Sequence, residues 1–170
     1  MSGNGSGKHM EDKDKVLSRL QKLCAGQECC TKDVYSKALK ALGGDAHAAS
    51  EVVASLVSDG YVDDRRYAVA FARDKALLTG WGPVKVRFAL SGKGISGEVA
   101  DAALEGVDNE PASRKLYALL SRKAYALAGD PQMKLKLLKF ALGRGYEYDT
   151  VRPLVEQVIR SSAGVSDDND

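Results

Sequence analysis

Residues 60–95, GYVDDRRYAVAFARDKALLTGWGPVKVRFALSGKGI, decide the fold of this chain. Two carboxylates near their start suit the N-terminus of a helix, and Gly80-Trp81-Gly82 then interrupts the helical pattern. Pro83 follows at the first-turn position that proline prefers, and glycines at 92 and 94 end the pattern. The stretch therefore predicts two consecutive helices, over about residues 64–78 and 83–92.

The same pattern continues on both sides of this stretch. Apolar residues recur at helical spacing, with capping residues such as Thr31 before them and glycines after them. Aromatic residues make up only 6% of the chain, and few runs suit a strand, so we expect an all-α protein. The remaining predicted helices cover about residues 13–23, 31–42, 46–58, 96–104, 112–127, 131–142 and 149–160.

Gly43, Gly94 and Gly145 each follow the second helix of a predicted triplet and are 51 residues apart. This spacing favours a tandem array of three three-helix repeats, elongated and curved, over a nine-helix globule with coincidental spacing. The predicted repeats cover residues 11–60, 61–109 and 110–161. Residues 1–10 look like a cloning remnant and residues 162–170 like an acidic tail, and we expect both to be disordered.

No group of residues in the sequence predicts catalysis, a metal or a cofactor. Cys24, Cys29 and Cys30 lack the further ligands that a zinc site needs, so free thiols are favoured over a metal site or a redox pair. We interpret Asp63 and Asp64 as helix caps rather than as an acid–base pair or metal ligands. The chain is therefore predicted not to be an enzyme. Apolar runs shorter than a membrane span and the lack of a signal-peptide pattern lead us to expect a cytoplasmic monomer.

Two residues of the central stretch carry specific structural predictions. Asp74 falls between Phe71 and Leu78 on the face that we expect to be buried. A buried carboxylate needs a partner, so we predict that Asp74 binds a basic side chain or the free amides where the Pro83 helix begins. Trp81 is predicted to hold the junction between the two helices, with stacking on a nucleic-acid base as the alternative.

Charge is segregated along the chain, although the net charge is only +2. Residues 65–94 contain seven basic residues and one acidic residue, and residues 114–144 contain eight and one. Residues 98–110 contain five acidic residues and no basic one. Stacked repeats would align the basic faces into a track suited to a phosphate backbone or an acidic protein groove. Scattered surface charge is the alternative interpretation.

The middle repeat carries several motifs in a fixed order. They are Gly60-Tyr61-Val62-Asp63-Asp64, Arg66-Tyr67-Ala68, Ala70-Phe71-Ala72-Arg73, Gly80-Trp81-Gly82-Pro83, Val86-Arg87, Leu90 and Lys93-Gly94-Ile95. Together they resemble the RecX family, whose members regulate the RecA recombinase. The third repeat is similar at lower specificity, through Phe140-Ala141-Leu142 and Arg144-Gly145-Tyr146.

The resemblance implies a helical array that binds RecA filaments on single-stranded DNA, with or without direct DNA contact. Binding would restrain filament growth and suppress ATP hydrolysis, strand exchange and the co-protease activity of the SOS response. A stand-alone DNA-binding repeat protein and a helical scaffold without a nucleic-acid role remain the alternatives. The residues that the resemblance implies for contact with RecA or DNA are Arg66, Arg73, Lys75, Lys85, Arg87, Lys93, Lys136, Lys139 and Arg144.

Overall fold

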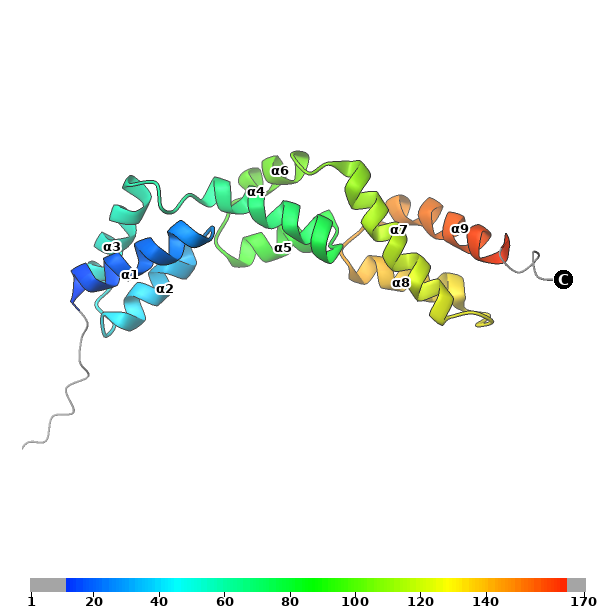
Figure 1. The fold of residues 1–170 in the computed structure, drawn as a ribbon, viewed down its shortest axis with the longest axis horizontal. Coiled ribbons are helices and arrows are strands. Elements are labelled where there is room, and N and C mark those ends of the chain that lie inside the picture. Colours follow the sequence, from blue (N-terminus) through cyan, green and yellow to red (C-terminus); the bar gives the residue numbers. More distant parts are fainter. Residues whose placement is uncertain (1–11, 165–170) are drawn as a thin grey trace, which may run out of the picture. The chain divides into compact units, whose positions relative to one another are not determined.

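The computed structural model describes residues 12–164, in which every regular element is helical (Figure 1). This confirms the all-α prediction. The expectations for residues 1–10 and for residues 165–170 of the acidic tail fall outside the described residues. The last helix ends at Gly164 rather than near residue 160, so the prediction of disorder is wrong for residues 162–164. The helices are α1 (Lys13–Gly26), α2 (Thr31–Ala41), α3 (Ala46–Ser58), α4 (Asp64–Asp74), the π-helix η1 (Lys75–Thr79), α5 (Pro83–Gly92), α6 (Gly97–Glu105), α7 (Asn109–Ala126), α8 (Met133–Gly143) and α9 (Tyr148–Gly164).

The three evenly spaced glycines share one backbone role. Gly43, Gly94 and Gly145 adopt φ values of 66°, 74° and 92°, the left-handed region in which glycine replaces other residues without strain. Each follows the second helix of a triplet and turns the chain toward the third. The spacing of 51 residues therefore reflects a shared helix ending.

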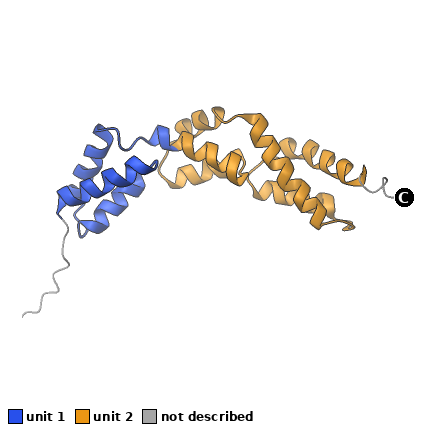
Figure 2. Cartoon of the chain, in the orientation of Figure 1, with its two compact units in different colours: residues 1–67 blue, residues 68–170 orange. Residues whose placement is uncertain are grey.

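The chain divides into two compact units, residues 1–67 and 68–170 (Figure 2). In the first unit α1, α2 and α3 enclose a core of Val16, Leu20, Val34, Ala38, Val52 and Leu56. Carboxylates begin two of these helices: Asp12 accepts a hydrogen bond from Asp14 N and Asp45 accepts one from Ala48 N, both at 3.0 Å. Cys24, Cys29 and Cys30 are buried in this unit and form no disulfide within residues 12–164.

The second unit contains the second triplet from Ala68 of α4 onward, together with the third triplet. In the third triplet, α7, α8 and α9 pack around a core of Leu116, Leu120, Leu137, Ala141, Val151 and Val155. In the second triplet, the buried residues include Ala68, Ala72 and Ala76 on one side and Val86 and Leu90 of α5 on the other. The chain forms two compact units rather than three, so the predicted boundaries between three repeats stay a prediction.

The helix predicted over residues 64–78 changes geometry after Asp74, where α4 gives way to the π-helix η1. Its buried face follows Ala68, Ala72 and Ala76, while Leu78 is 72% exposed. The prediction that Asp74 lies on the buried face is therefore wrong. Asp74 is exposed, and its Oδ1 lies 3.5 Å from Nε of Arg73, so its partner is a basic side chain at the surface.

The loop after η1 contacts the end of α8 and joins the second triplet to the third. Gly82 N donates to the carbonyl oxygen of Arg144 at 2.7 Å, and Val84 N donates to that of Gly145 at 3.0 Å. A Cβ on Gly82 would overlap the Gly145 carbonyl group and would lie 2.7 Å from Cγ of Tyr146. Gly82 is therefore needed for space, and this close backbone contact places both triplets in one compact unit.

Candidate functional site

The basic residues predicted to contact a partner lie in both compact units. Arg66 belongs to the first unit, and the other eight belong to the second. Each can now be assigned the contacts that it makes within its own unit.

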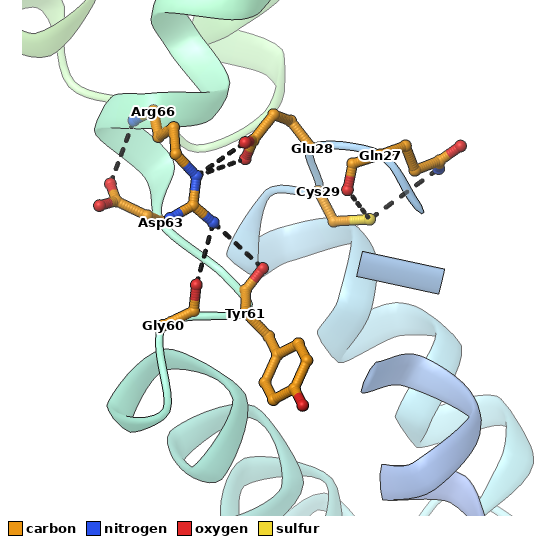
Figure 3. Close-up of polar contacts among 7 residues, drawn as sticks. All are labelled: Gln27, Glu28, Cys29, Gly60, Tyr61, Asp63 and Arg66. Carbon is orange, nitrogen blue, oxygen red and sulfur yellow. Dashed lines mark hydrogen bonds and ion pairs between the residues drawn. The ribbon is translucent and has the colours of Figure 1, made fainter. Parts of the chain in front are cut away.

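Arg66 holds two loops of the first unit together (Figure 3). Its Nε lies 2.7 and 2.8 Å from the two carboxylate oxygens of Glu28, in the loop after α1. Its second guanidinium nitrogen donates to the carbonyl oxygens of Gly60 and Tyr61, at 3.0 and 3.3 Å. The hydrogen bond to Glu28 raises the pKa of Arg66 above its usual range. Sequence reasoning missed this structural role, because Glu28 lies 38 residues away.

The carboxylates Asp63 and Asp64 cap two different helices. Asp63 Oδ1 accepts a hydrogen bond from Arg66 N at 3.1 Å and so caps α4. Asp64 Oδ1 accepts one from Thr31 N at 2.8 Å, at the start of α2. The N-cap of α2 is Cys30, whose side chain makes no cap hydrogen bond, so the assignment of Thr31 as that cap is wrong by one residue. Asp63 therefore caps the helix that follows it, as predicted, whereas Asp64 is the first residue of α4 and bonds to the start of α2 instead.

Lys75 and Lys85 lie together at the Trp81 side chain. Their Nζ atoms are 4.5 and 4.6 Å from the centre of the Trp81 ring, within the range of a cation–π contact. Trp81 also packs edge-on against Phe71, with ring centres 6.3 Å apart. The tryptophan therefore helps to hold the junction, as predicted, and it gathers two positive charges at one place.

The other predicted residues of the second triplet are held more loosely. Arg73 is 60% exposed, and its ion-pair partner within residues 12–164 is the exposed carboxylate of Asp74. Arg87 is 47% exposed, and its Nε lies 2.8 Å from Oδ1 of Asp101 on α6. Lys93 is half-buried after α5. Exposed ion pairs contribute little to stability, so Arg73 and Arg87 can exchange these partners for others at low cost.

The three predicted residues of the third triplet have different roles. Arg144 donates to the carbonyl oxygen of Thr79 at 2.9 Å and lies 5.2 Å from the ring centre of Phe140, so it reinforces the contact between triplets. Lys136 pairs with Asp130, and this hydrogen bond lowers the pKa of the Asp130 carboxyl. Lys139 is exposed and makes no hydrogen bond or ion pair within residues 12–164.

Phe88 is a prominent surface residue that sequence reasoning missed. Its side chain is 81% exposed on α5, between the buried residues Val86 and Leu90. The signal was available in the sequence, since a residue two positions after Val86 and two before Leu90 points away from their face. Large exposed aromatic side chains are enriched at protein interfaces.

A cavity of about 530 Å³ lies beside Trp81, Arg87 and Tyr146 in the second unit. The Tyr146 hydroxyl is buried and has no hydrogen-bond partner among residues 12–164, and burial raises the pKa of Tyr146. Across residues 12–164, no three His, Cys, Asp or Glu side chains come close enough to hold a metal ion. The search of the same residues for a helix able to cross a membrane found none.

Exposed cations and apolar side chains on helical triplets suit a protein that acts by binding others. The comparisons with known proteins show its family. The family model for the second three-helix domain of RecX matches residues 63–104. The regulatory protein RecX of Chlorobaculum tepidum is 30% identical over 159 residues, which cover 93% of this chain and 97% of that protein. The chain therefore belongs to the RecX family.

Other relatives are longer, and solved structures support the fold. A regulatory protein RecX of Clostridium botulinum is 30% identical over 132 residues, and this chain spans 61% of its length. For Bacillus mycoides RecX that share is 41%. The crystal structure of RecX from Lactobacillus salivarius matches with a TM-score of 0.69 at 22% identity, covering 88% of this chain and 95% of that one. A second RecX crystal structure matches with a TM-score of 0.72 at 20% identity, covering 85% and 71%.

These findings confirm three predictions from the sequence. The chain is a regulatory protein of the RecX family, it has the all-helical fold of that family, and it belongs to a non-enzymatic class. The assignment of individual contact residues stays a prediction.

Proposed function

We propose that this protein binds RecA filaments on single-stranded DNA and inhibits their growth, ATP hydrolysis and recombination activity. One observation carries the proposal, namely the likeness to a regulatory protein RecX over 93% of this chain and 97% of the relative. Direct contact with single-stranded DNA, a monomeric state and a cytoplasmic location belong to the same proposal.

Inhibition follows from occupation of the filament rather than from chemistry. A chain of packed helices can present several side chains to a long partner at once, and its cations suit phosphates or carboxylates there. Lys139 has no competing polar partner in the described part of the chain, and Arg73 has an exposed one. Lys75 and Lys85 offer two adjacent charges at Trp81. We assign the strongest contacts to these four residues.

The remaining predicted residues support the surface in this proposal. Arg66 and Arg144 hold backbone carbonyl groups of their own units, so their replacement perturbs the fold as well as any contact. Arg87, Lys93 and Lys136 contribute charge at the edges of the interface. Tests of binding therefore use Arg73 and Lys139, because their removal leaves these backbone contacts in place.

The test is a titration of this protein into RecA on single-stranded DNA while ATP hydrolysis is followed. Inhibition well below one protein per RecA supports action on the filament. Inhibition that appears only when the protein saturates the DNA, and that excess DNA abolishes, would instead indicate a stand-alone DNA-binding protein. Absence of both inhibition and DNA binding would leave a helical scaffold and refute the proposal.

A further inference from the structure

The helix α5 carries apolar residues on the side that faces away from its core. Val86 and Leu90 are fully buried, whereas Val84 is 46% and Phe88 81% exposed. Because successive residues advance by about 100° around a helix axis, Phe88 lies nearly opposite the midpoint of the two buried residues. Val84 lies one turn earlier on the same outward side.

The helix α8 shares part of this arrangement 51 residues later. Its buried residues Leu137 and Ala141 stand 51 positions after the two buried residues of α5. Leu135 stands 51 positions after Val84 and is 48% exposed, and Leu142 is 43% exposed. Val84 and Leu135 thus occupy equivalent positions of the two helices, whereas Lys139 takes the position of Phe88 and Leu142 is a separate exposed residue of α8.

The two outward faces follow one another within the second unit. The backbone hydrogen bonds from Gly82 to Arg144 and from Val84 to Gly145 bring the end of α8 to the start of α5. Figure 1 shows α8 and α5 in succession along one edge of this unit. The side chains of Val84, Phe88, Leu135 and Leu142 are called the apolar row below.

The chemistry of the apolar row favours a protein partner over nucleic acid. Three of its four members are aliphatic and offer no ring for a base to stack on, whereas residues four apart on a helix are the usual anchors in an apolar groove. Lys85 and Arg87 flank Phe88 on α5, and Lys139 lies between Leu135 and Leu142 on α8. The partner surface that fits is an apolar groove bordered by carboxylates.

The first unit lacks this feature. On α2 the position between the buried residues Val34 and Ala38 is Ser36, and Lys32 precedes them. Both of these outward residues are polar, and both are exposed. Lys32 thus stands in α2 where α5 and α8 have the exposed apolar residues Val84 and Leu135.

We propose that the apolar row is the surface through which the second unit docks on RecA itself, in apolar, carboxylate-bordered grooves of successive RecA subunits. Two successive helices that each expose apolar side chains beside cations suit a partner made of identical repeated subunits. This inference rests on the proposed function, because the filament supplies that repeating partner. It adds that the apolar row contacts RecA protein rather than DNA.

The test compares Phe88→Ser and Leu135→Ser with Tyr125→Ser, which removes an 86% exposed aromatic residue of α7 from outside the row. Two measurements are made on each variant: inhibition of RecA ATP hydrolysis on single-stranded DNA, and anisotropy of labelled single-stranded DNA without RecA. Circular dichroism and the urea midpoint check folding, which we expect to be unchanged because the replaced side chains are exposed. The row variants should need at least about tenfold more protein for half-inhibition, with unchanged DNA affinity, as expected for interface hot spots. Tyr125→Ser should behave as the wild type.

Each other outcome contradicts the inference in a distinct way. Row variants that inhibit like the wild type would show that RecA docks elsewhere, and the proposed function would stand. A parallel loss of DNA affinity would show that the row is a nucleic-acid surface. A wild-type protein without any effect on RecA would refute the proposed function and this inference with it.

Discussion

Replacement of Gly82 by alanine tests whether a contact that only glycine permits joins the second and third triplets. Gly82 has φ −87° and ψ 170°, values that other residues adopt readily, so alanine introduces no backbone strain there. Its Cβ would instead overlap the Gly145 carbonyl group and lie 2.7 Å from Cγ of Tyr146. The substitution therefore isolates the steric requirement from the conformational one.

The expected cost combines three contributions. The loop must move away from α8 to admit the Cβ, and the overpacking costs about 1–3 kcal/mol. The same movement weakens the hydrogen bonds from Gly82 to Arg144 and from Val84 to Gly145, each worth about 0.5–1.5 kcal/mol. Alanine restricts the unfolded chain and returns about 0.4–1 kcal/mol. We therefore expect the free energy of unfolding of the second unit to fall by about 1–5 kcal/mol.

The loss of stability can be measured by urea unfolding, monitored through the fluorescence of Trp81. Trp81 is the only tryptophan of the sequence and directly precedes Gly82, so its signal reports on the site of the substitution. The matched control is Gly143→Ala at the end of α8, where an added Cβ meets nothing within 4 Å. That variant should be as stable as the wild type or more stable by up to about 1 kcal/mol. Equal stability of Gly82→Ala and Gly143→Ala would refute the steric argument.

Three further predictions concern contacts in the two units. Arg66→Gln and Glu28→Gln should each lower the free energy of unfolding, because each removes the ion pair between these two residues. The double variant should lose less than the sum of the two single losses. Additive losses in urea unfolding would contradict this prediction. Asp64→Ala should lower the free energy of unfolding by about 1 kcal/mol, because α2 loses its cap. Asp74→Ala should leave the urea midpoint unchanged, because the ion pair of Asp74 is exposed. A larger loss of stability in Asp74→Ala than in Asp64→Ala would show that the caps are misassigned. Burial raises the pKa of Cys24 to about 12, from 9.0, so the folded state holds this proton more tightly than the unfolded state. The free energy of unfolding should therefore fall as the pH rises from about 9 to about 12. The fall should be smaller in Cys24→Ala, which lacks this thiol. An identical fall in that variant would show that the raised pKa of Cys24 does not cause it.

The order of the helices was predictable because its signals are local. Glycine at 43, 94 and 145 needs a left-handed backbone, and proline at 83 begins a helix, whatever surrounds them. The family was predictable for a related reason, since the motifs around Gly80 and Gly82 encode the junction between triplets. That junction requires glycines, because a side chain at these positions would overlap its neighbours, and glycines are easily recognised in a sequence.

The register of α4 was not predictable in the same way. Large apolar residues suggested a buried face through Phe71 and Leu78, but the structure buries the small residues Ala68, Ala72 and Ala76. Small side chains let a neighbouring helix approach closely, and the turn then widens into the π-helix η1. A choice between two apolar faces depends on what packs against them, and that information lies elsewhere in the chain.

The site was the least predictable feature, because a basic residue does not reveal its partner. Arg66 resembled a contact residue in the sequence, yet it binds Glu28 and two carbonyl groups in its own unit. Lys139 had no distinguishing mark, yet it is exposed and without a polar partner in the described part of the chain. Long-range pairing of this kind appears only when the helices are assembled.

The central claim is that cations of the second unit bind the RecA filament, and one measurement tests it most directly. The double variant Arg73→Glu/Lys139→Glu is compared with Lys15→Glu/Lys22→Glu, which makes the same change of charge at two exposed residues of α1. Both are titrated into RecA on single-stranded DNA while ATP hydrolysis is followed. The account predicts that the first variant loses most of its inhibition and that the second retains it. Equal inhibition by the two variants would contradict the account.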